Sequence, residues 1–286
     1  MKRKVIIIFL FILLVLIIAT AFIVLIQQSL FFYPNHNAEA HKILSEHTEF
    51  EEISIEYKKG EHVYGWLKYN VDKEEQSPLL IFFGGNAQSA SNTALFYLQN
   101  NIYKYYEGYN ILMIDYPGYG LSEGTPSDKN MFDSALKIYD YIVDMKMVDK
   151  SNIVVMGFSI GTGVATYLSS QREVNGLILL APYDRGLSLY NGALNIFHGP
   201  LKLLARYKFN SLEYAKDVTV KPLIAFSYDD EVISYQLAEN LVNYFNETYK
   251  VVTLNNVKHN YIITNLVVLE EIQNYLIITG DNKKVK

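Results

Sequence analysis

The chain has 286 residues, a net charge of -5 and a composition that is 50% hydrophobic and 14% aromatic. Charged residues make up only 19% of the sequence, which excludes an intrinsically disordered chain and favours a large apolar core. The slightly acidic balance offers no basic surface to a polyphosphate backbone, so nucleic acid is excluded as a partner.

Cysteine is absent, which excludes disulfides, thiolate metal sites and a cysteine nucleophile. None of the histidines is spaced with a second ligand in a metal-binding motif. We therefore predict neither a metal nor another cofactor. The six histidines are His36, His41, His47, His62, His198 and His259.

The N-terminal segment predicts a transmembrane anchor over residues 1–29. No charged residue occurs from Val5 to Ile26, and as a helix this run is about 33 Å long, against a hydrocarbon layer of about 30 Å. A cleaved signal peptide is the alternative, because Ala19-Thr20-Ala21 resembles a cleavage site. The apolar run continues past these residues, which favours an uncleaved anchor.

The flanks of this segment predict its orientation. Three basic residues precede the span, and none follows it before Lys42. The positive-inside rule then places the N-terminus in the cytoplasm and the remaining chain on the extracytoplasmic side. Phe31, Phe32 and Tyr33 follow the span, where aromatic side chains suit the membrane interface, and Pro34 prevents the helix from continuing.

Residues 30–286 predict one α/β domain, because short apolar runs alternate with segments of helical period. The expected fold is an eight-stranded, mostly parallel sheet with helices on both faces, whose first two strands form a hairpin turned at 59–61. Strands are predicted at 53–58, 63–69, 79–83, 111–115, 153–157, 177–181, 223–227 and 251–254. Helices are predicted at 89–105, 129–145, 161–171, 234–245 and 261–277.

The connection between the strands at 177–181 and 223–227 is longer than an ordinary loop. Its apolar residues predict a small helical cap over about 183–216. Most of these side chains are expected to pack the cap onto the sheet, and a few to line an acyl pocket.

The motif that carries chemistry is Gly157-Phe158-Ser159-Ile160-Gly161, which fits GxSxG. It lies directly after a buried strand and before a helix, the sharp turn that exposes a nucleophilic serine in α/β-hydrolases. The helix N-terminus that follows also offers unpaired N–H groups to a developing oxyanion. Ser159 is therefore the candidate nucleophile.

A serine nucleophile needs a histidine base and a carboxylate that orients it, and in this fold the chain order is Ser, acid, His. Only His198 and His259 follow Ser159. His198 lies inside the predicted cap, whereas His259 follows the last strand and precedes the final helix. We predict His259 as the base; the alternative is an exposed loop histidine.

The acid is expected after the strand at 223–227, in Asp229-Asp230-Glu231-Val232-Ile233. We select Asp230, because the apolar pair that ends this run begins the packing of the next helix and fixes the turn. Asp229 and Glu231 are then solvated turn residues. Asp184, one strand earlier, is a more distant alternative.

The second oxyanion donor is expected in the loop Gly84-Gly85-Asn86-Ala87, where glycines let the backbone approach a ligand. We predict the backbone N–H groups of Asn86 and Ile160 as the oxyanion hole. Gly85 and Ala87 remain alternatives to Asn86.

Together these segments resemble the ABHD13/BEM46-like α/β-hydrolases over almost the whole chain from Leu30 onward. The resemblance rests on residues 30–34, 82–87, 115–124, 157–161, 229–233 and 257–260. It implies a membrane-anchored serine hydrolase with Ser159, Asp230 and His259 as its triad. The chain departs from the pattern at Gly84, Pro117 and Ser234, where many relatives carry His, Arg and Pro; these departures bear on the oxyanion hole and the substrate.

The predicted activity is cleavage of carboxylic ester or thioester bonds through an acyl-enzyme on Ser159. The anchor and the apolar cap suggest lipid-like or small acyl substrates. Two alternatives remain: a serine peptidase of the S33 type, which uses the same triad on amides, and a catalytically silent fold that binds a ligand at the membrane.

Overall fold

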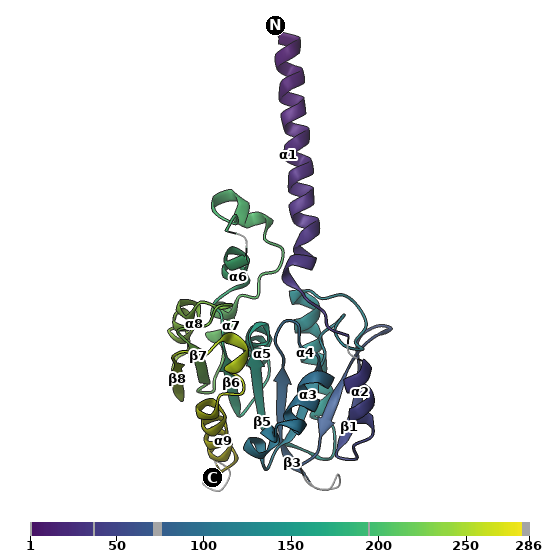
Figure 1. The fold of residues 1–286 in the computed structure, drawn as a ribbon, viewed down its shortest axis with the longest axis vertical. Coiled ribbons are helices and arrows are strands. Elements are labelled where there is room, and N and C mark those ends of the chain that lie inside the picture. Colours follow the sequence, from purple (N-terminus) through teal and green to yellow (C-terminus); the bar gives the residue numbers. More distant parts are fainter. Residues whose placement is uncertain (1, 37, 71–75, 194, 282–286) are drawn as a thin grey trace.

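The computed structural model describes residues 2–36, 38–70, 76–193 and 195–281. Within them, eight strands form one sheet in the order β1-β2-β4-β3-β5-β6-β7-β8 (Figure 1). β1 pairs antiparallel with β2, and β2 antiparallel with β4; every other pair is parallel. The strands are β1 (Phe50–Lys58), β2 (Glu61–Lys68), β3 (Ser77–Phe83), β4 (Asn110–Ile114), β5 (Val148–Phe158), β6 (Gly176–Leu180), β7 (Leu223–Ser227) and β8 (Lys250–Leu254).

This sheet confirms the predicted fold class, including the hairpin at its edge. All eight predicted strands are present, and the largest difference is that β5 begins at Val148, five residues early. β4, β6 and β7 are buried along their whole length because helices cover both faces of the parallel sheet. β1 alternates between buried and exposed residues, as expected for a strand with one solvated face.

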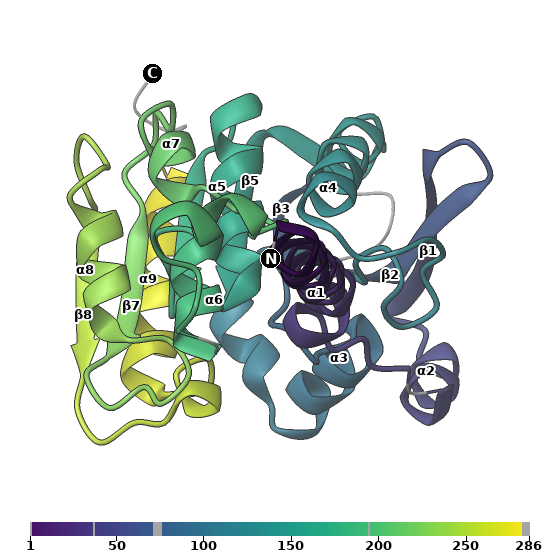
Figure 2. The ribbon, with the colours of Figure 1, turned by 90° about the horizontal axis from the view of Figure 1, so that it is seen from above.

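Helices cover the sheet in two layers (Figure 2). One apolar cluster joins the sheet to α4 (Asp128–Ile142), α5 (Ile160–Gln171), α7 (Ser211–Ala215) and α8 (Tyr235–Val242). A second cluster on the opposite face contains residues of α2 (Ala38–Ser45), α3 (Ala90–Gln99), the 3-10 helix η1 (Ile102–Tyr106) and α9 (Leu266–Asp281).

The helix predictions needed two corrections. The single helix predicted at 89–105 is broken into α3 and η1 because Asn101 adopts a left-handed conformation (φ 54°), which an asparagine tolerates better than most residues. The helix predicted at 261–277 begins later, at Leu266, after the short 3-10 helix η3 (His259–Tyr261). α2 was not predicted.

The N-terminal helix α1 (Lys2–Phe31) is continuous and projects from the domain (Figure 1). It is long and apolar enough to cross a membrane. Its C-terminal end differs from prediction: Phe31 and Phe32, expected at a membrane interface, are only 8% and 3% exposed. Both rings pack on Tyr207 and Phe209, because the chain after β6 folds back over them. Tyr33 is exposed.

The connection between β6 and β7, where the cap was predicted, is helical. It contains α6 (Gly186–Ala193), the 3-10 helix η2 (Gly199–Leu204) and α7, and it rises beside the C-terminal turns of α1 (Figure 1). Tyr190 and Phe197 are buried and pack against each other in a tilted arrangement, with ring centroids 4.9 Å apart. The division into residues 1–29, residues 30–286 and a cap at about 183–216 stays a prediction.

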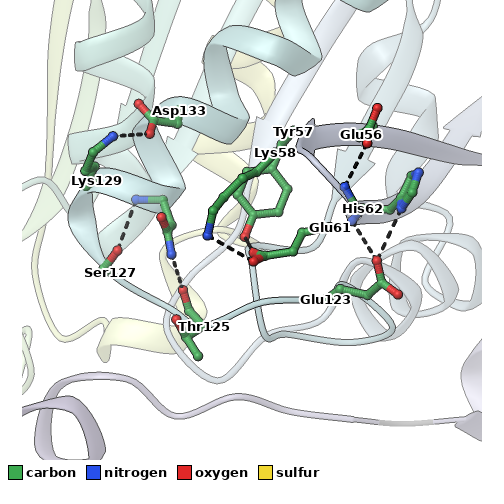
Figure 3. A network of polar contacts seen from close by, with 12 residues as sticks. Glu56, Tyr57, Lys58, Glu61, His62, Glu123, Thr125, Ser127, Lys129 and Asp133 are labelled. Atoms are coloured by element: carbon green, nitrogen blue, oxygen red, sulfur yellow. Dashed lines mark hydrogen bonds and ion pairs between the residues drawn. The ribbon is translucent and has the colours of Figure 1, made fainter.

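A polar network fastens the turn-rich segment 115–124 to the β1–β2 hairpin (Figure 3). The Glu123 carboxylate accepts the backbone N–H of His62 at 2.8 Å and lies 3.2 Å from its Nδ1. Nearby, the Tyr57 hydroxyl donates to Glu61 at 2.5 Å. Burial, followed by this hydrogen bond to a carboxylate, raises the pKa of Tyr57. The network holds a loop in place at the surface.

Candidate active site

Ser159 occupies the turn between β5 and α5, with φ 54° and ψ -122°. A non-glycine residue with positive φ is strained, and such strain persists only where surrounding contacts hold it. Two such contacts are the hydrogen bonds from the Ser159 backbone N–H to the Leu180 carbonyl and from the Tyr183 hydroxyl to the Ile160 carbonyl. The turn thereby aims the serine hydroxyl away from the sheet.

The two glycines of the motif permit this turn by close packing. A Cβ at Gly161 would lie 2.1 Å from the Phe83 carbonyl oxygen, and a Cβ at Gly157 would lie 2.4 Å from the Gly161 carbonyl oxygen. Both contacts are with backbone, which has no room to yield. Any side chain at these positions would therefore separate β5, α5 and the end of β3.

The structure brings the three predicted triad residues into one chain of contacts. His259 Nε2 lies 3.0 Å from Ser159 Oγ, and His259 Nδ1 lies 2.7 Å from Asp230 Oδ2. The serine, the imidazole and the aspartate side chain are all buried. The Phe158 ring, centred 5.0 Å from the imidazole, covers it from the β5 side. Asp230 also accepts the backbone N–H groups of Val232 and Ile233, both at 2.8 Å, which fixes its carboxylate.

The neighbours of Asp230 have a more definite role than predicted. Asp229 and Glu231 are exposed, but each accepts a backbone N–H from the loop that carries His259. Asp229 binds Asn256 at 2.6 Å, and Glu231 binds His259 itself at 3.1 Å. Hydrogen bonds from backbone N–H groups lower the pKa of Glu231, so it stays ionised and keeps this tether.

The alternative residues lie elsewhere. Asp184 accepts a hydrogen bond from Asn240 at 2.8 Å, and its backbone carbonyl accepts the N–H of Leu212. It thus holds the base of the cap. His198 is exposed in the cap and lies 2.6 Å from the Asn195 side chain.

The loop after β3 is held by side-chain contacts that the sequence did not predict. Gln88 Oε1 accepts the Gly85 N–H at 2.7 Å, so that donor is already used. The Asn86 side chain makes three bonds: it donates to the Phe31 carbonyl at 2.7 Å and accepts from the Tyr33 N–H at 3.0 Å and the Tyr119 hydroxyl at 2.6 Å. The only available signal was an asparagine inside a glycine turn.

The backbone N–H groups of Asn86 and Ile160 have no hydrogen-bond acceptor within the described part of the chain. Asn86, Ile160 and Ser159 all line one pocket of about 780 Å³, which lies in the size range of small-molecule sites. Gly85 and Ala87 do not line it. The rest of its wall comes largely from α1, the cap and the segment 228–237.

A buried carboxylate holds the start of α3, directly after the loop that follows β3. Asp115, at the end of β4, accepts the N–H of Ala90, the first residue of α3, at 2.7 Å. Burial raises its pKa to about 7.

Among the described residues, no group of three or more acidic or histidine side chains is arranged to hold a metal ion.

Comparisons with known proteins agree with the fold described above. The α/β-hydrolase fold family matches residues 78–214. The Pyrococcus furiosus esterase Pf2001 superimposes with a TM-score of 0.65 at 18% identity, over 86% of this chain and 97% of that one. The chain belongs to the α/β-hydrolase superfamily.

Two relatives of this α/β-hydrolase have similar sequences. An uncharacterised protein of Mycobacterium tuberculosis is 26% identical over 231 residues, which are 80% of either chain. The lysophosphatidylserine lipase ABHD12 of Bos taurus is 30% identical over 58% of this chain and 45% of its own length. These relationships support a hydrolase; the narrower ABHD13/BEM46-like assignment stays a prediction.

Proposed function

We propose that this α/β-hydrolase is a serine esterase in which Ser159 is the nucleophile, His259 the general base and Asp230 the residue that orients it. The observation that carries the proposal is the buried contact chain from Asp230 through His259 to Ser159, at 2.7 and 3.0 Å. A serine hydroxyl becomes a useful nucleophile only when a base accepts its proton, and a carboxylate on the opposite ring nitrogen keeps the imidazole in the required tautomer.

The first half of the reaction forms the acyl-enzyme. Ser159 Oγ attacks the ester carbonyl carbon as its proton passes to His259 Nε2, and the carbonyl oxygen becomes an oxyanion. The backbone N–H groups of Asn86 and Ile160 would donate to that oxygen. As the C–O bond to the alcohol breaks, the imidazolium returns its proton to the leaving oxygen.

The second half reverses these roles. A water molecule gives a proton to His259 and attacks the acyl carbon, and the second tetrahedral intermediate expels Ser159 Oγ, which regains a proton from the imidazolium. The carboxylic acid leaves and the enzyme is restored. The same steps apply to a thioester, with a thiol as the leaving group.

The substrates we propose are lipid-like or small acyl esters. The pocket next to Ser159 has an apolar wall that includes Ile26, Leu189 and Phe197. The relative ABHD12 is described as a lysophosphatidylserine lipase, which fits an acyl substrate near a membrane. We further propose a signal-anchor topology with a cytoplasmic N-terminus and the catalytic domain on the extracytoplasmic side, supported by the basic residues before the span.

The test is active-site labelling with a fluorophosphonate probe. Wild-type protein should label covalently, Ser159→Ala should not, and Ser170→Ala, a control on the outer side of α5, should label like wild type. Hydrolysis of p-nitrophenyl esters of increasing chain length would then define the acyl preference. Absence of labelling in folded wild-type protein would refute the proposal in favour of a binding module, and release of amino acids from aminoacyl-naphthylamides would favour a peptidase.

A further inference from the structure

The pocket beside Ser159 is partly walled by the membrane-crossing helix itself. Ile23, Ile26 and Leu30 of α1 line it together with Ser159. The opposite wall includes Ile196 and Phe197 of the cap. An acyl chain in this pocket would therefore touch the anchor and the cap at once.

The position of these residues along α1 places this wall where the membrane span ends. A hydrocarbon layer of about 30 Å is crossed by about 20 helical residues, so a span that begins after Lys4 ends near Val24. Residues 2–22 of α1 are exposed, and contact with the domain begins at Ile23. The pocket wall therefore begins at the boundary between hydrocarbon and headgroups.

The cap is fastened to α1 at the same level. Gln27 is buried; its side-chain amide donates to the Leu204 carbonyl at 2.9 Å, and its Oε1 accepts the Arg206 N–H at 2.8 Å. These bonds tie η2 to the helix one turn after Ile23. Figure 1 shows the cap rising beside the C-terminal turns of α1, away from the sheet.

On its outer side, the cap segment 196–204 exposes apolar side chains to the surroundings of the protein. Leu203 is 81% exposed and Leu201 47%. Lys202 is exposed between the two leucines. Apolar side chains with a cation among them, on a short helix beside a membrane span, are typical of a segment that lies in the lipid interface.

We propose that the cap segment 196–204 inserts into the lipid leaflet next to α1, and that the active-site pocket opens sideways into that leaflet between the two. An acyl-ester lipid then reaches Ser159 directly from the bilayer, with its chain along Ile23 and Ile26, without first leaving the membrane for water. The proposal rests on the serine esterase function proposed above and deepens it by naming the route and the source of the substrate.

Depth-dependent quenching tests the insertion directly, and the absence of cysteine makes a single-site label simple. Leu203→Cys and Ile277→Cys variants of the full chain, each labelled with an environment-sensitive fluorophore, are reconstituted in phosphatidylcholine vesicles that contain an acyl-chain nitroxide lipid. Ile277 is the matched control, because it is 56% exposed on α9, whose C-terminal end lies far from α1 (Figure 1). We expect quenching at 203 and not at 277; equal quenching at the two sites would overturn the proposal.

A second measurement tests the route of the substrate. Leu203→Asp should lower hydrolysis of a long-chain ester embedded in the vesicles about tenfold, relative to hydrolysis of a soluble butyrate ester by the same sample. Ile277→Asp should leave this ratio unchanged. An unchanged ratio in Leu203→Asp would overturn the proposed route while the esterase function stands. If wild-type protein neither hydrolyses the soluble ester nor reacts with the fluorophosphonate, the esterase function itself is refuted.

Discussion

Two of the histidine–carboxylate pairs in the described part of the chain lie in very different surroundings. His259 Nδ1 lies 2.7 Å from Asp230, and the two side chains are 5% and 2% exposed. His62 Nδ1 lies 3.2 Å from Glu123, and there the exposed fractions are 38% and 50% (Figure 3). The Asp230–His259 pair lies just after the C-terminal ends of the parallel strands β7 and β8, whereas the His62–Glu123 pair joins a surface loop to the β1–β2 hairpin.

The difference teaches that distance by itself does not indicate function. Water screens the exposed pair, and neither ring nitrogen of His62 meets a nucleophile in the described structure. In the buried pair, the second nitrogen of His259 reaches Ser159, so the carboxylate can act through the ring on a third residue. Burial and a third partner separate the candidate triad from a surface contact.

The largest effect is expected when the buried pair is broken. Asp230→Asn preserves the shape but replaces an acceptor by an amide that favours the wrong imidazole tautomer, so kcat should fall about 10⁴-fold. Initial rates on a p-nitrophenyl ester measure this, and Glu123→Gln is the matched control in the exposed pair, with wild-type kcat expected. An Asp230→Asn enzyme that keeps a tenth of the wild-type rate would contradict the assigned role.

A second effect concerns the half-buried Asn86 side chain, which holds the predicted oxyanion loop in place. Asn86→Ala removes the three side-chain bonds to Phe31, Tyr33 and Tyr119, and should lower kcat about 10- to 100-fold by misplacing the backbone donor. KM should change little, because the donor acts on charge that develops in the transition state. Tyr119→Phe, which loses one of these bonds, should show a smaller loss. A change confined to KM would mean that Asn86 only shapes the pocket.

The third effect is on stability and comes from Asp115, a buried carboxylate that, unlike Asp230, makes no hydrogen bond to a histidine in the described structure. Because burial raises the pKa of Asp115 to about 7, the folded state binds a proton that the unfolded state releases between about pH 4 and 7. Asp115 therefore lowers the free energy of unfolding as pH rises through this window, by at most ~1.4 kcal/mol per pH unit.

Denaturant unfolding of wild type and Asp115→Asn at pH 5 and pH 7.5 measures this slope. The asparagine variant should lose less stability between the two pH values than wild type does, since its side chain does not ionise and still accepts the Ala90 N–H. Parallel pH dependence in the two proteins would show that Asp115 does not titrate in this window.

The smallest effect is expected at the exposed pair. Glu123→Gln should lower the free energy of unfolding only slightly, and added salt should reduce the difference because the pair is open to solvent. The measurement is the denaturation midpoint at low and high ionic strength. A loss as large as that of a buried pair would break the comparison drawn above.

The sequence alone determined where the strands and the helices between them lie along the chain, and that the sheet is mostly parallel. These features follow from hydrophobic periodicity and from short apolar runs, which are recognisable in the sequence without the structure. Chain order also selected Ser159, Asp230 and His259 as the candidate site. Their catalytic role stays a prediction, which the contact distances support.

Only the tertiary structure decided what lies against what across long separations. It buried Phe31 and Phe32, which the sequence assigned to a membrane interface, and it joined Asn86 to the end of α1. It also turned Asp229 and Glu231 into tethers for the His259 loop. Local pattern reports how apolar or polar a segment is, but the same aromatic run suits a lipid interface and a protein core equally well. Which of the two surrounds it depends on partners more than 150 residues away, such as Tyr190 and Tyr207.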